Sequence, residues 1–438
     1  MEKRQKNEQS LLTGNRRVGF TDLAEAFQQY PEKIREILQL SHTLDFYPYR
    51  SGLFPASALP GELGEITSMG MAWLRDSAHI ADGLWQSGDT ESATAAGRAI
   101  LDIFKDQNTI HKMEGIINGS LDPKDPNSRP PVRVDGDTLI YTGYNDANIQ
   151  NDSVGYSIWL ASRLIKNGEI NTSADDINTL ALITRYLGAI RYWEDADSGH
   201  WEETRKVNAS SIGVVVAGLK STKELFVSLG YNHNSLELTD LINKGAETLN
   251  QILPYESPGP GELERRYDSA LLFLVEPMNV VSPEQARMIV DDITRHMVRD
   301  IGIARYPKDS YWHPDFRDEV KLGERATFIP GAFEKRETLA QENNEAQWTL
   351  FDPLLSVYWG KQFKETGNTS ARERQMWHLN RSLGQLVCGG PDGQSLLLPE
   401  AYFLERGQWV ANDHVPLLWS QANLMLALDM FEKTSRQA

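Results

Sequence analysis

Cysteine is almost absent from this sequence of 438 residues, and Cys388 is its only representative. One cysteine excludes an intramolecular disulfide and a zinc site built from cysteines. No apolar run approaches the roughly 20 residues that are needed to cross a bilayer. The first ten residues, MEKRQKNEQS, are polar and precede no apolar signal-peptide core. We therefore expect a soluble, cytoplasmic protein.

Basic residues are also fewer than acidic ones, with 44 Lys and Arg against 61 Asp and Glu, which gives a net charge of −17. This balance disfavours binding to nucleic acid or to an anionic membrane. The sequence also lacks a phosphate-binding glycine-rich loop, a nucleophilic serine elbow and a pair of histidines at metal-ligand spacing. We expect a small-molecule partner, and the sequence indicates no oligomeric state.

Helical periodicity dominates the chain, and no convincing run of strands is visible. Residues 107–149 carry few helical signals and include a loop with four prolines at 122–131. Such a long irregular stretch is typical of a functional loop or a rim ornament. The predicted helices cover residues 31–42, 72–85, 89–105, 150–165, 173–192, 210–229, 235–253, 282–298, 345–362, 369–387 and 413–432.

The predicted helices are of two kinds. Residues 212–219 and 424–428 are apolar on every side, which is typical of helices buried all round. Residues 282–298 and 369–387 instead carry one apolar stripe and many charges. Buried helices that alternate with amphipathic ones predict two concentric layers, as in an all-α, α/α barrel. We expect a flexible tail at residues 1–20 and one domain at 21–438.

The sequence Trp201-Glu202-Glu203 places two adjacent carboxyl groups beside an aromatic ring, just before a predicted helix. A sugar-cleaving site needs groups that move protons and a flat apolar face for the sugar ring. Glu202 is the candidate general acid, which must hold a proton near neutral pH, and the neighbouring Glu203 is a source of the necessary repulsion. The alternative is a solvated surface loop.

A second carboxyl candidate lies near the C-terminus, in Leu398-Pro-Glu400-Ala-Tyr402. The preceding proline restrains the backbone of Glu400, which we assign as the candidate general base that activates water. In an inverting glycosidase the two carboxyl groups are roughly 6.5–9.5 Å apart. Trp409 and Trp419 follow, and we interpret His414 as a hydrogen-bonding residue at a helix start rather than as a base or metal ligand.

Three further polar clusters precede predicted helices or lie in loops. In Trp73-Leu-Arg75-Asp76, the guanidinium and carboxylate suit sugar hydroxyls, with a capping Asp and a surface Arg as the alternative. The second cluster, at 150–156, contains Asp152, for which the alternatives are accepting a sugar hydroxyl or capping the helix, and we favour a structural or supporting role. The third cluster, 304–312 together with Glu345-Ala-Gln-Trp348, predicts an aromatic, charged rim that contains Arg305, Asp309, Tyr311, Trp312 and Trp348.

In this order, the clusters other than that of Asp152 resemble the glucoamylases of glycoside hydrolase family 15. The matching motifs are Trp73-Leu-Arg75-Asp76, Trp201-Glu202-Glu203, Arg305-Tyr-Pro-Lys-Asp309, Glu400-Ala-Tyr402 and Trp419. The resemblance implies an (α/α)6 barrel that releases β-glucose from α-glucosides with inversion. It also implies that Glu202 is the acid, that Glu400 is the base, and that Arg75, Asp76, Glu203 and Arg305 hold the innermost glucose. We add Trp201, Trp348, Tyr402 and Trp419 as substrate-binding residues.

One departure from the family pattern precedes the first motif, where Met69 and Met71 stand in place of an aromatic residue near the innermost sugar. A second resemblance is to the glucoamylase-like domain of the regulatory phosphorylase kinase α and β subunits. Its motifs are 208–213, 345–348, 398–402 and 416–421, together with Trp201-Glu202. The expected activities are thus an inverting α-glucosidase on short glucans or a disaccharide, or a non-catalytic sugar-binding regulator. Neither requires a metal or a cofactor.

Overall fold

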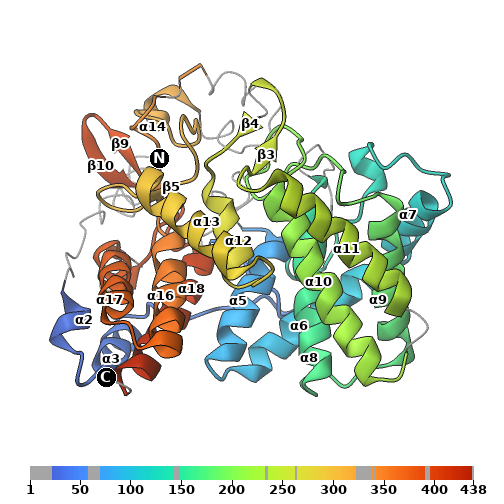
Figure 1. Cartoon of the computed structure of the whole chain (residues 1–438), viewed down its shortest axis with the longest axis horizontal. Helices are drawn as coiled ribbons and strands as arrows, with labels where there is room; N and C mark the ends of the chain where they lie inside the picture. The colour runs from blue at the N-terminus through green and yellow to red at the C-terminus, as the bar shows by residue number, and fades with distance from the viewer. Residues whose placement is uncertain are drawn as a thin grey trace, which may run out of the picture.

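The structure is a computed structural model that describes residues 22–57, 70–141, 148–231, 235–261, 264–321, 338–339, 341–389 and 395–436. The expected tail at residues 1–20 and Met69 lie outside these residues. Helices make up most of the described chain, as predicted, and they fall into two layers (Figure 1).

The inner layer of the described chain is a closed ring of six helices, in which each contacts the next and the last returns to the first. The all-apolar stretches at 212–219 and 424–428 lie in two of them and are almost entirely buried, as predicted, and two further inner helices, which those stretches did not indicate, are buried on nearly every side as well. The ring comprises, in order, α5 (Leu74–Gln86), α8 (Asn151–Lys166), α10 (Ala209–Ser228), α12 (Leu272–Val275), α16 (Phe351–Thr366) and α18 (Leu418–Ser435).

The outer layer consists of amphipathic helices, each packed against an inner one. On α13, for example, only Ile289, Val290 and Ile293 are buried, and Ser282 closes its N-terminus with a capping box. The two layers confirm the predicted (α/α)6 barrel. The outer helices are α3 (Glu32–Leu40), α6 (Thr90–Lys105), α9 (Ala174–Ala189), α11 (Ser235–Ile252), α13 (Pro283–His296) and α17 (Thr369–Gly384).

A further helix, α7 (Gln107–Ile117), occupies a region where we expected few helical elements, so that prediction was wrong. Its start is set by Asp106, whose side chain accepts hydrogen bonds from the backbone N–H groups of Asn108 and Thr109. Helix α7 packs outside the barrel against α9. The short helices that remain among the described residues are α2 (Leu23–Ala26), η1 (Pro126–Ser128), η5 (Ser269–Leu271) and α14 (Phe316–Glu319).

The chain also contains strands, which the periodicity did not indicate. Four of them form an antiparallel sheet in the order β10-β9-β6-β5: β10 (Gln408–Ala411), β9 (Ala401–Glu405), β6 (Gln347–Trp348) and β5 (Ile303–Ala304). Strands β9 and β10 are joined by Arg406 and Gly407, both with positive φ, as a two-residue hairpin requires. Because residues 347–348 pair in this sheet, α16 begins at Phe351 rather than at the predicted residue 345. Helix α18 also begins later than predicted, at Leu418 rather than at residue 413.

Three two-stranded pairs complete the described strands: β1 (Ala72–Trp73) with β2 (Arg133–Val134), β3 (Ser257–Pro258) with β4 (Glu264–Arg265), and β7 (Val387–Gly389) with β8 (Ser395–Leu397). Strand β1 runs directly into α5, and β6 lies just before α16. Figure 1 shows the labelled strands gathered at one end of the barrel helices. The segments that enter the inner helices are therefore held at a common end.

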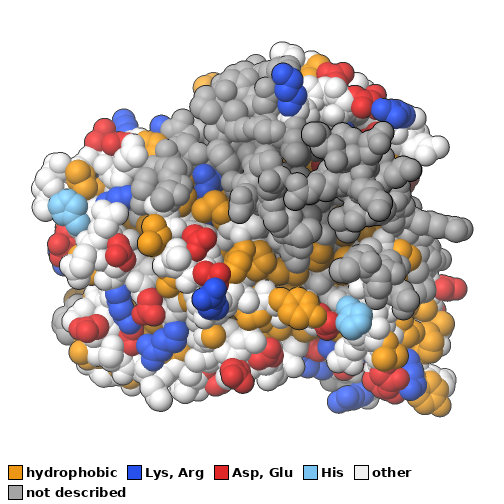
Figure 2. All heavy atoms as spheres, turned by 180° about the vertical axis from the view of Figure 1, so that it is seen from behind, with side chains coloured by type: hydrophobic (Ala, Val, Ile, Leu, Met, Phe, Trp, Pro, Cys, Tyr) orange, Lys and Arg blue, Asp and Glu red, His pale blue; other side chains and the backbone are white. Residues whose placement is uncertain are grey.

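The described surface seen in Figure 2 mixes acidic, basic and hydrophobic side chains, and no basic patch gathers on the described part of this face. In the parts of the chain that the structure describes, no helix combines the length and the hydropathy required to cross a membrane.

Candidate active site

Polar residues mark the start of each inner helix in the described chain. Arg75 and Asp76 lie in the first turn of α5, and Asp152 lies in the first turn of α8. The Trp201–Glu203 loop precedes α10, and Asp268 caps η5 directly before α12. The other two sites are Trp348 before α16 and Trp419 in the first turn of α18. The barrel thus brings the predicted clusters together at one end, with Asp268 as an unpredicted member.

The loop that carries the two adjacent glutamates is closed by a bridge between Asp197 and Lys206. Within it the backbone N–H of Glu203 donates to the carbonyl of Ser198 at 3.1 Å. Glu202 has a φ of +58°, a left-handed conformation that side-chain-bearing residues rarely adopt. This turn sends the two neighbouring carboxyl groups to different partners.

Glu202 contacts Arg75, whose Nη2 donates to its Oε1 at 3.1 Å. The same guanidinium lies 3.3 Å from Asp76 and 3.7 Å from Asp152, and it also donates to Gln150 at 3.1 Å. The single positive charge of Arg75 is therefore shared by three carboxyl groups.

Carboxyl groups in this cluster hold their protons to a higher pH than free carboxyl groups do. Burial raises the pKa of Asp76 to about 6 against the opposing charge of Arg75, and the carboxylate of Glu202 adds to the rise. Burial also raises the pKa of Asp152 to about 6, again opposed by Arg75. A site with more acids than cations, removed from water, is suited to proton donation.

Glu203 lies in a different environment, surrounded by cations. Arg265 donates to its Oε2 at 2.9 Å, Arg305 to its Oε1 at 3.3 Å, and Lys206 lies at 3.7 Å. The hydroxyl of Tyr306 also donates to Oε1. Burial favours the neutral acid, but the charges of Arg265, Lys206 and Arg305 outweigh it and lower the pKa of Glu203 to about 2.

Because these cations balance its negative charge, Glu203 stays ionised and holds the surrounding side chains in place. The adjacency of the two glutamates predicts that Glu203 supplies the repulsion felt by Glu202. The structure instead places Asp76 and Asp152 around the arginine that Glu202 contacts.

Arg305 is held in place by a two-point ion pair, because its Nε and Nη2 donate to the two oxygens of Asp309, each at 2.6 Å. Its guanidinium carbon lies 5.0 Å from the ring centre of Trp201, 4.9 Å from that of Tyr311 and 5.1 Å from that of Trp348. Guanidinium groups favour aromatic faces at such distances. The predicted aromatic, charged rim is therefore one packed unit.

Trp348, Trp359 and Trp419 carry indole N–H groups that are buried without a hydrogen-bond acceptor among the described residues, and of these Trp348 and Trp419 lie at the helix starts that carry the site, whereas Trp359 lies further along α16. Trp348 lies 5.7 Å from Trp201, centre to centre, and Trp419 stacks on His79 at 4.1 Å. A buried donor without a partner is costly, and a bound hydroxyl group satisfies it. These two groups are therefore candidates for sugar contacts.

Glu400 is held by both its backbone and its side chain. Its N–H donates to the carbonyl of His414 at 2.9 Å, and its carbonyl accepts from the N–H of Thr349 at 3.2 Å. Its Oε2 accepts from Asn412 Nδ2 at 2.6 Å, lies 2.7 Å from His414 Nδ1, and accepts from the Tyr311 hydroxyl at 3.3 Å. His414 is thus a hydrogen-bonding residue, but its partner is the candidate base.

Glu202 and Glu400 act on common neighbours. Burial raises the pKa of Asp76, and the charges of both glutamates contribute. Burial also raises the pKa of Tyr311, again with contributions from Glu400 and Glu202. Two carboxyl groups that are 198 positions apart in the sequence are therefore both near enough to influence Asp76 and Tyr311.

Tyr402 differs from its predicted role as a sugar contact. Its side chain is fully buried, and its hydroxyl donates at 2.6 Å to the backbone carbonyl of Gln385. It packs in a small core with Ile301, Val387 and Ala411. Residues two positions apart share a face of a regular strand, but β9 begins at Ala401, so Glu400 lies outside its alternation and Tyr402 need not share its surroundings.

Sequence reasoning missed several site residues, notably Arg265, Asp268, Tyr306 and Asn412. Asp268 accepts from the indole N–H of Trp201 at 2.9 Å and lies 3.3 Å from Arg265. The signal that predicted the other helix starts was present here too, as Asp268 followed by an apolar run. It was missed because the helix it begins is very short.

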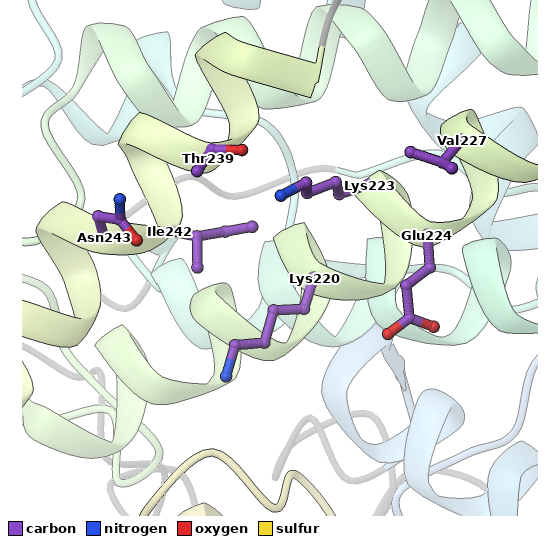
Figure 3. A pocket seen from close by; sticks show the side chains of 7 residues that line it. All are labelled: Lys220, Lys223, Glu224, Val227, Thr239, Ile242 and Asn243. Atoms are coloured by element: carbon purple, nitrogen blue, oxygen red, sulfur yellow. The ribbon is translucent and has the colours of Figure 1, made fainter. Parts of the chain in front are cut away.

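A groove elsewhere on the barrel carries none of these residues. It lies between α10 and α11 and is lined by Lys220, Lys223, Glu224, Val227, Thr239, Ile242 and Asn243 (Figure 3). Lys220 follows the start of α10 by 11 residues, so it lies about 16 Å along the helix from the candidate active site.

The comparisons with known proteins agree with this geometry. The model of the glycosyl hydrolases family 15 matches residues 41–427, which is most of the chain. The chain therefore belongs to glycoside hydrolase family 15.

Solved structures share the fold at low identity. The wild-type form of a glycosidase superposes with a TM-score of 0.65 at 19% identity, over 92% of this chain and 98% of that one. The glucoamylase from Saccharomycopsis fibuligera gives a TM-score of 0.58 at 16% identity, over 98% and 99% of the two chains.

A curated relative has a regulatory name. This chain is 24% identical over 337 residues to a probable phosphorylase b kinase regulatory subunit alpha of Caenorhabditis elegans. The match covers 66% of this chain but only 26% of that protein. The chain therefore spans about a quarter of the length of this relative.

Proposed function

We propose that this protein is an inverting, exo-acting α-glucosidase that releases β-glucose from short α-glucans or an α-linked glucose disaccharide. The observation that carries the proposal is the pair of carboxyl groups, Glu202 and Glu400, which enter one site from two loops and act on the same neighbours, Asp76 and Tyr311. Residues 21–438 form its catalytic domain in this proposal.

In the proposed reaction, Glu202 donates its proton to the glycosidic oxygen as the bond from that oxygen to C1 breaks. Glu400 accepts a proton from a water molecule whose oxygen bonds to C1 from the opposite face, so the product is the β-anomer. The acid has then lost one proton and the base has gained one, and exchange with solvent restores both. Arg75, Asp76 and Arg305 offer charged donors and acceptors to the sugar hydroxyls.

The choice of an α-glucoside is supported by family membership and by the printed names of structural relatives. A glycosidase variant was solved in complex with glucose, and a bacterial glucoamylase was solved with acarbose. The aromatic faces of Trp201, Trp348 and Trp419 suit the apolar faces of sugar rings.

The test is glucose release from maltose, isomaltose, trehalose and maltooligosaccharides, with NMR to identify the first anomer. We expect β-glucose from the wild type, and Glu202→Gln and Glu400→Gln are each expected to lose at least about 1000-fold in kcat. Exposed Glu194→Gln is the matched control and keeps the wild-type rate. Initial α-glucose, or a near-native rate in either site variant, contradicts the assignment.

The second candidate is a sugar-binding regulator without turnover, which the match to the regulatory subunit favours. It predicts no glucose release from any substrate of the panel. It still predicts a rise in Tm with acarbose or glucose, because a ligand that binds only the folded state stabilises it. Ligand-dependent stabilisation without turnover therefore selects the regulator over the enzyme.

A further inference from the structure

All hydrogen bonds that the described residues make to the carboxylate of Glu400 converge on one oxygen. Asn412 Nδ2 lies 2.6 Å, His414 Nδ1 2.7 Å and the Tyr311 hydroxyl 3.3 Å from Oε2. The arrangement is asymmetric, because none of these three contacts is made to Oε1. The two oxygens of Glu400 therefore differ in their surroundings, because Oε2 accepts the hydrogen bonds of the protein and Oε1 accepts none of these three.

The proton on His414 follows from this contact. A carboxylate is only an acceptor, so a ring nitrogen at 2.7 Å from it must carry the hydrogen. Nδ1 is thus the protonated nitrogen of His414. A hydrogen bond to an ionised acceptor is stronger than one between neutral groups.

The backbone makes this contact rigid. The N–H of Glu400 donates to the carbonyl of His414 at 2.9 Å, so the two residues are joined by main chain and side chain alike. Asn412 supports both, since its Oδ1 accepts from the N–H of His414 at 3.3 Å while its Nδ2 reaches Glu400. Only 3% of His414 is exposed, so water does not compete for the imidazole.

We propose that His414 is a positioning residue for the base. Its Nδ1–H, together with Asn412, holds the negative charge of Glu400 on Oε2 and fixes the carboxylate in one rotamer, so that Oε1 accepts the proton of the attacking water. This inference rests on the proposed hydrolase function. It assigns a role to a residue of the loop before α18 that touches no substrate.

Two substitutions of similar shape separate the donor from the packing. In His414→Asn the side-chain amide places an N–H near the position of Nδ1, whereas in His414→Leu a methyl group takes that position. We expect His414→Leu to lower kcat by about 10- to 100-fold, the range for losing one hydrogen bond to a charged group. KM is expected to change less than about threefold, and His414→Asn should restore most of kcat.

A second substrate shows which carboxyl group His414 serves. Fluoride leaves without a proton, so α-glucosyl fluoride bypasses the general acid but still needs the base. Glu202→Gln should therefore recover on this substrate, while Glu400→Gln and His414→Leu should not. The double variant of Glu400→Gln and His414→Leu should match Glu400→Gln alone, because both changes act through one group.

The outcomes are distinguishable. If Glu400→Gln keeps its rate, the proposed function fails. If Glu400→Gln is inactive but His414→Leu is as fast as the wild type, or recovers on α-glucosyl fluoride, the inference on His414 is overturned. Tm values establish that each variant is folded. If His414→Leu does not fold, His414→Gln, which moves the donor by one methylene, is expected to show the same loss of kcat, and full activity would contradict the proposal.

Discussion

Adjacent residues in this chain have opposite electrostatic surroundings, as Glu202 and Glu203 demonstrate. Glu202 shares one arginine with two other acids, whereas Glu203 is in contact with several cations. The left-handed backbone at Glu202 separates them. The sequence predicted both residues as members of one site. Their different roles depend on Arg265 and Arg305, which are remote in the chain.

Glu203→Gln is expected to destabilise the protein, because it removes the carboxylate that Arg265, Arg305 and Lys206 share and leaves Asp309 and Asp268 as the remaining partners of the two arginines. We expect the free energy of unfolding to fall by about 3 kcal/mol, the scale for breaking a buried ion pair from one side. Urea denaturation measures the change. Glu194→Gln, in an exposed pair with Arg191, should cost less than about 1 kcal/mol. Equal costs for the two variants would show that Glu203 is not a structural anchor.

At the scale of elements, the inner helices α8 and α10 approach each other at glycines. A Cβ on Gly155 of α8 would lie 2.8 Å from the backbone nitrogen of Val215 in α10, and one on Gly218 would lie 2.6 Å from the carbonyl of Gly155. Backbone atoms cannot move aside as a side-chain tip can. The separation of α8 and α10 therefore depends on these positions.

Gly155→Ala should push α8 and α10 apart and cost about 2 kcal/mol of unfolding free energy, as overpacking does. It should also reduce glucose release, because Asp152, one turn earlier on α8, would shift against Arg75. Gly188→Ala on α9 is the matched control, since its Cβ meets only the end of the Leu241 side chain, at 3.2 Å. We expect that variant to be within about 1 kcal/mol of the wild type. Chemical denaturation of both decides the point.

For the molecule as a whole, buried acids contribute to the dependence of stability on pH, and the buried histidines His79, His200 and His378, whose pKa values burial lowers, act in the opposite direction below about pH 6.5. Burial raises the pKa of Asp76 and Asp152 to about 6, and burial together with the charge of Asp152 raises that of Asp197 to about 7. Between about pH 4 and 7 the folded protein holds protons that the unfolded chain has released, so stability falls as the pH rises. Glu203, with a pKa of about 2, acts oppositely, and its contribution is lost as the pH falls below about 4.5.

We therefore predict that the decline in stability that these acids cause between about pH 4 and 7 is smaller in Asp152→Asn than in the wild type. The substitution keeps the shape, removes one titrating group and relieves Asp197 of a neighbouring charge. Between pH 4 and 7.5, the free energy of unfolding of Asp152→Asn should rise relative to that of the wild type by on the order of 3 kcal/mol. Unfolding measured across this range tests the prediction, with exposed Asp291→Asn as a control that should leave the slope unchanged. A parallel slope in Asp152→Asn would refute it.

The sequence alone determined the architecture, because helical periodicity and the contrast between all-apolar and one-sided helices follow from which faces are buried. It also marked most helix starts that carry site residues. Short elements escaped it, as with α12 and the strands around Tyr402, since a few residues hold no measurable period. Only the tertiary structure decided which partners each charge has. Glu400 meets His414 and Asn412 through the β9–β10 hairpin, and Glu203 meets Arg265 from the segment before the neighbouring inner helix and Arg305 from beyond it. The second set of pairings depends on how the helices pack in the ring, which no local pattern encodes.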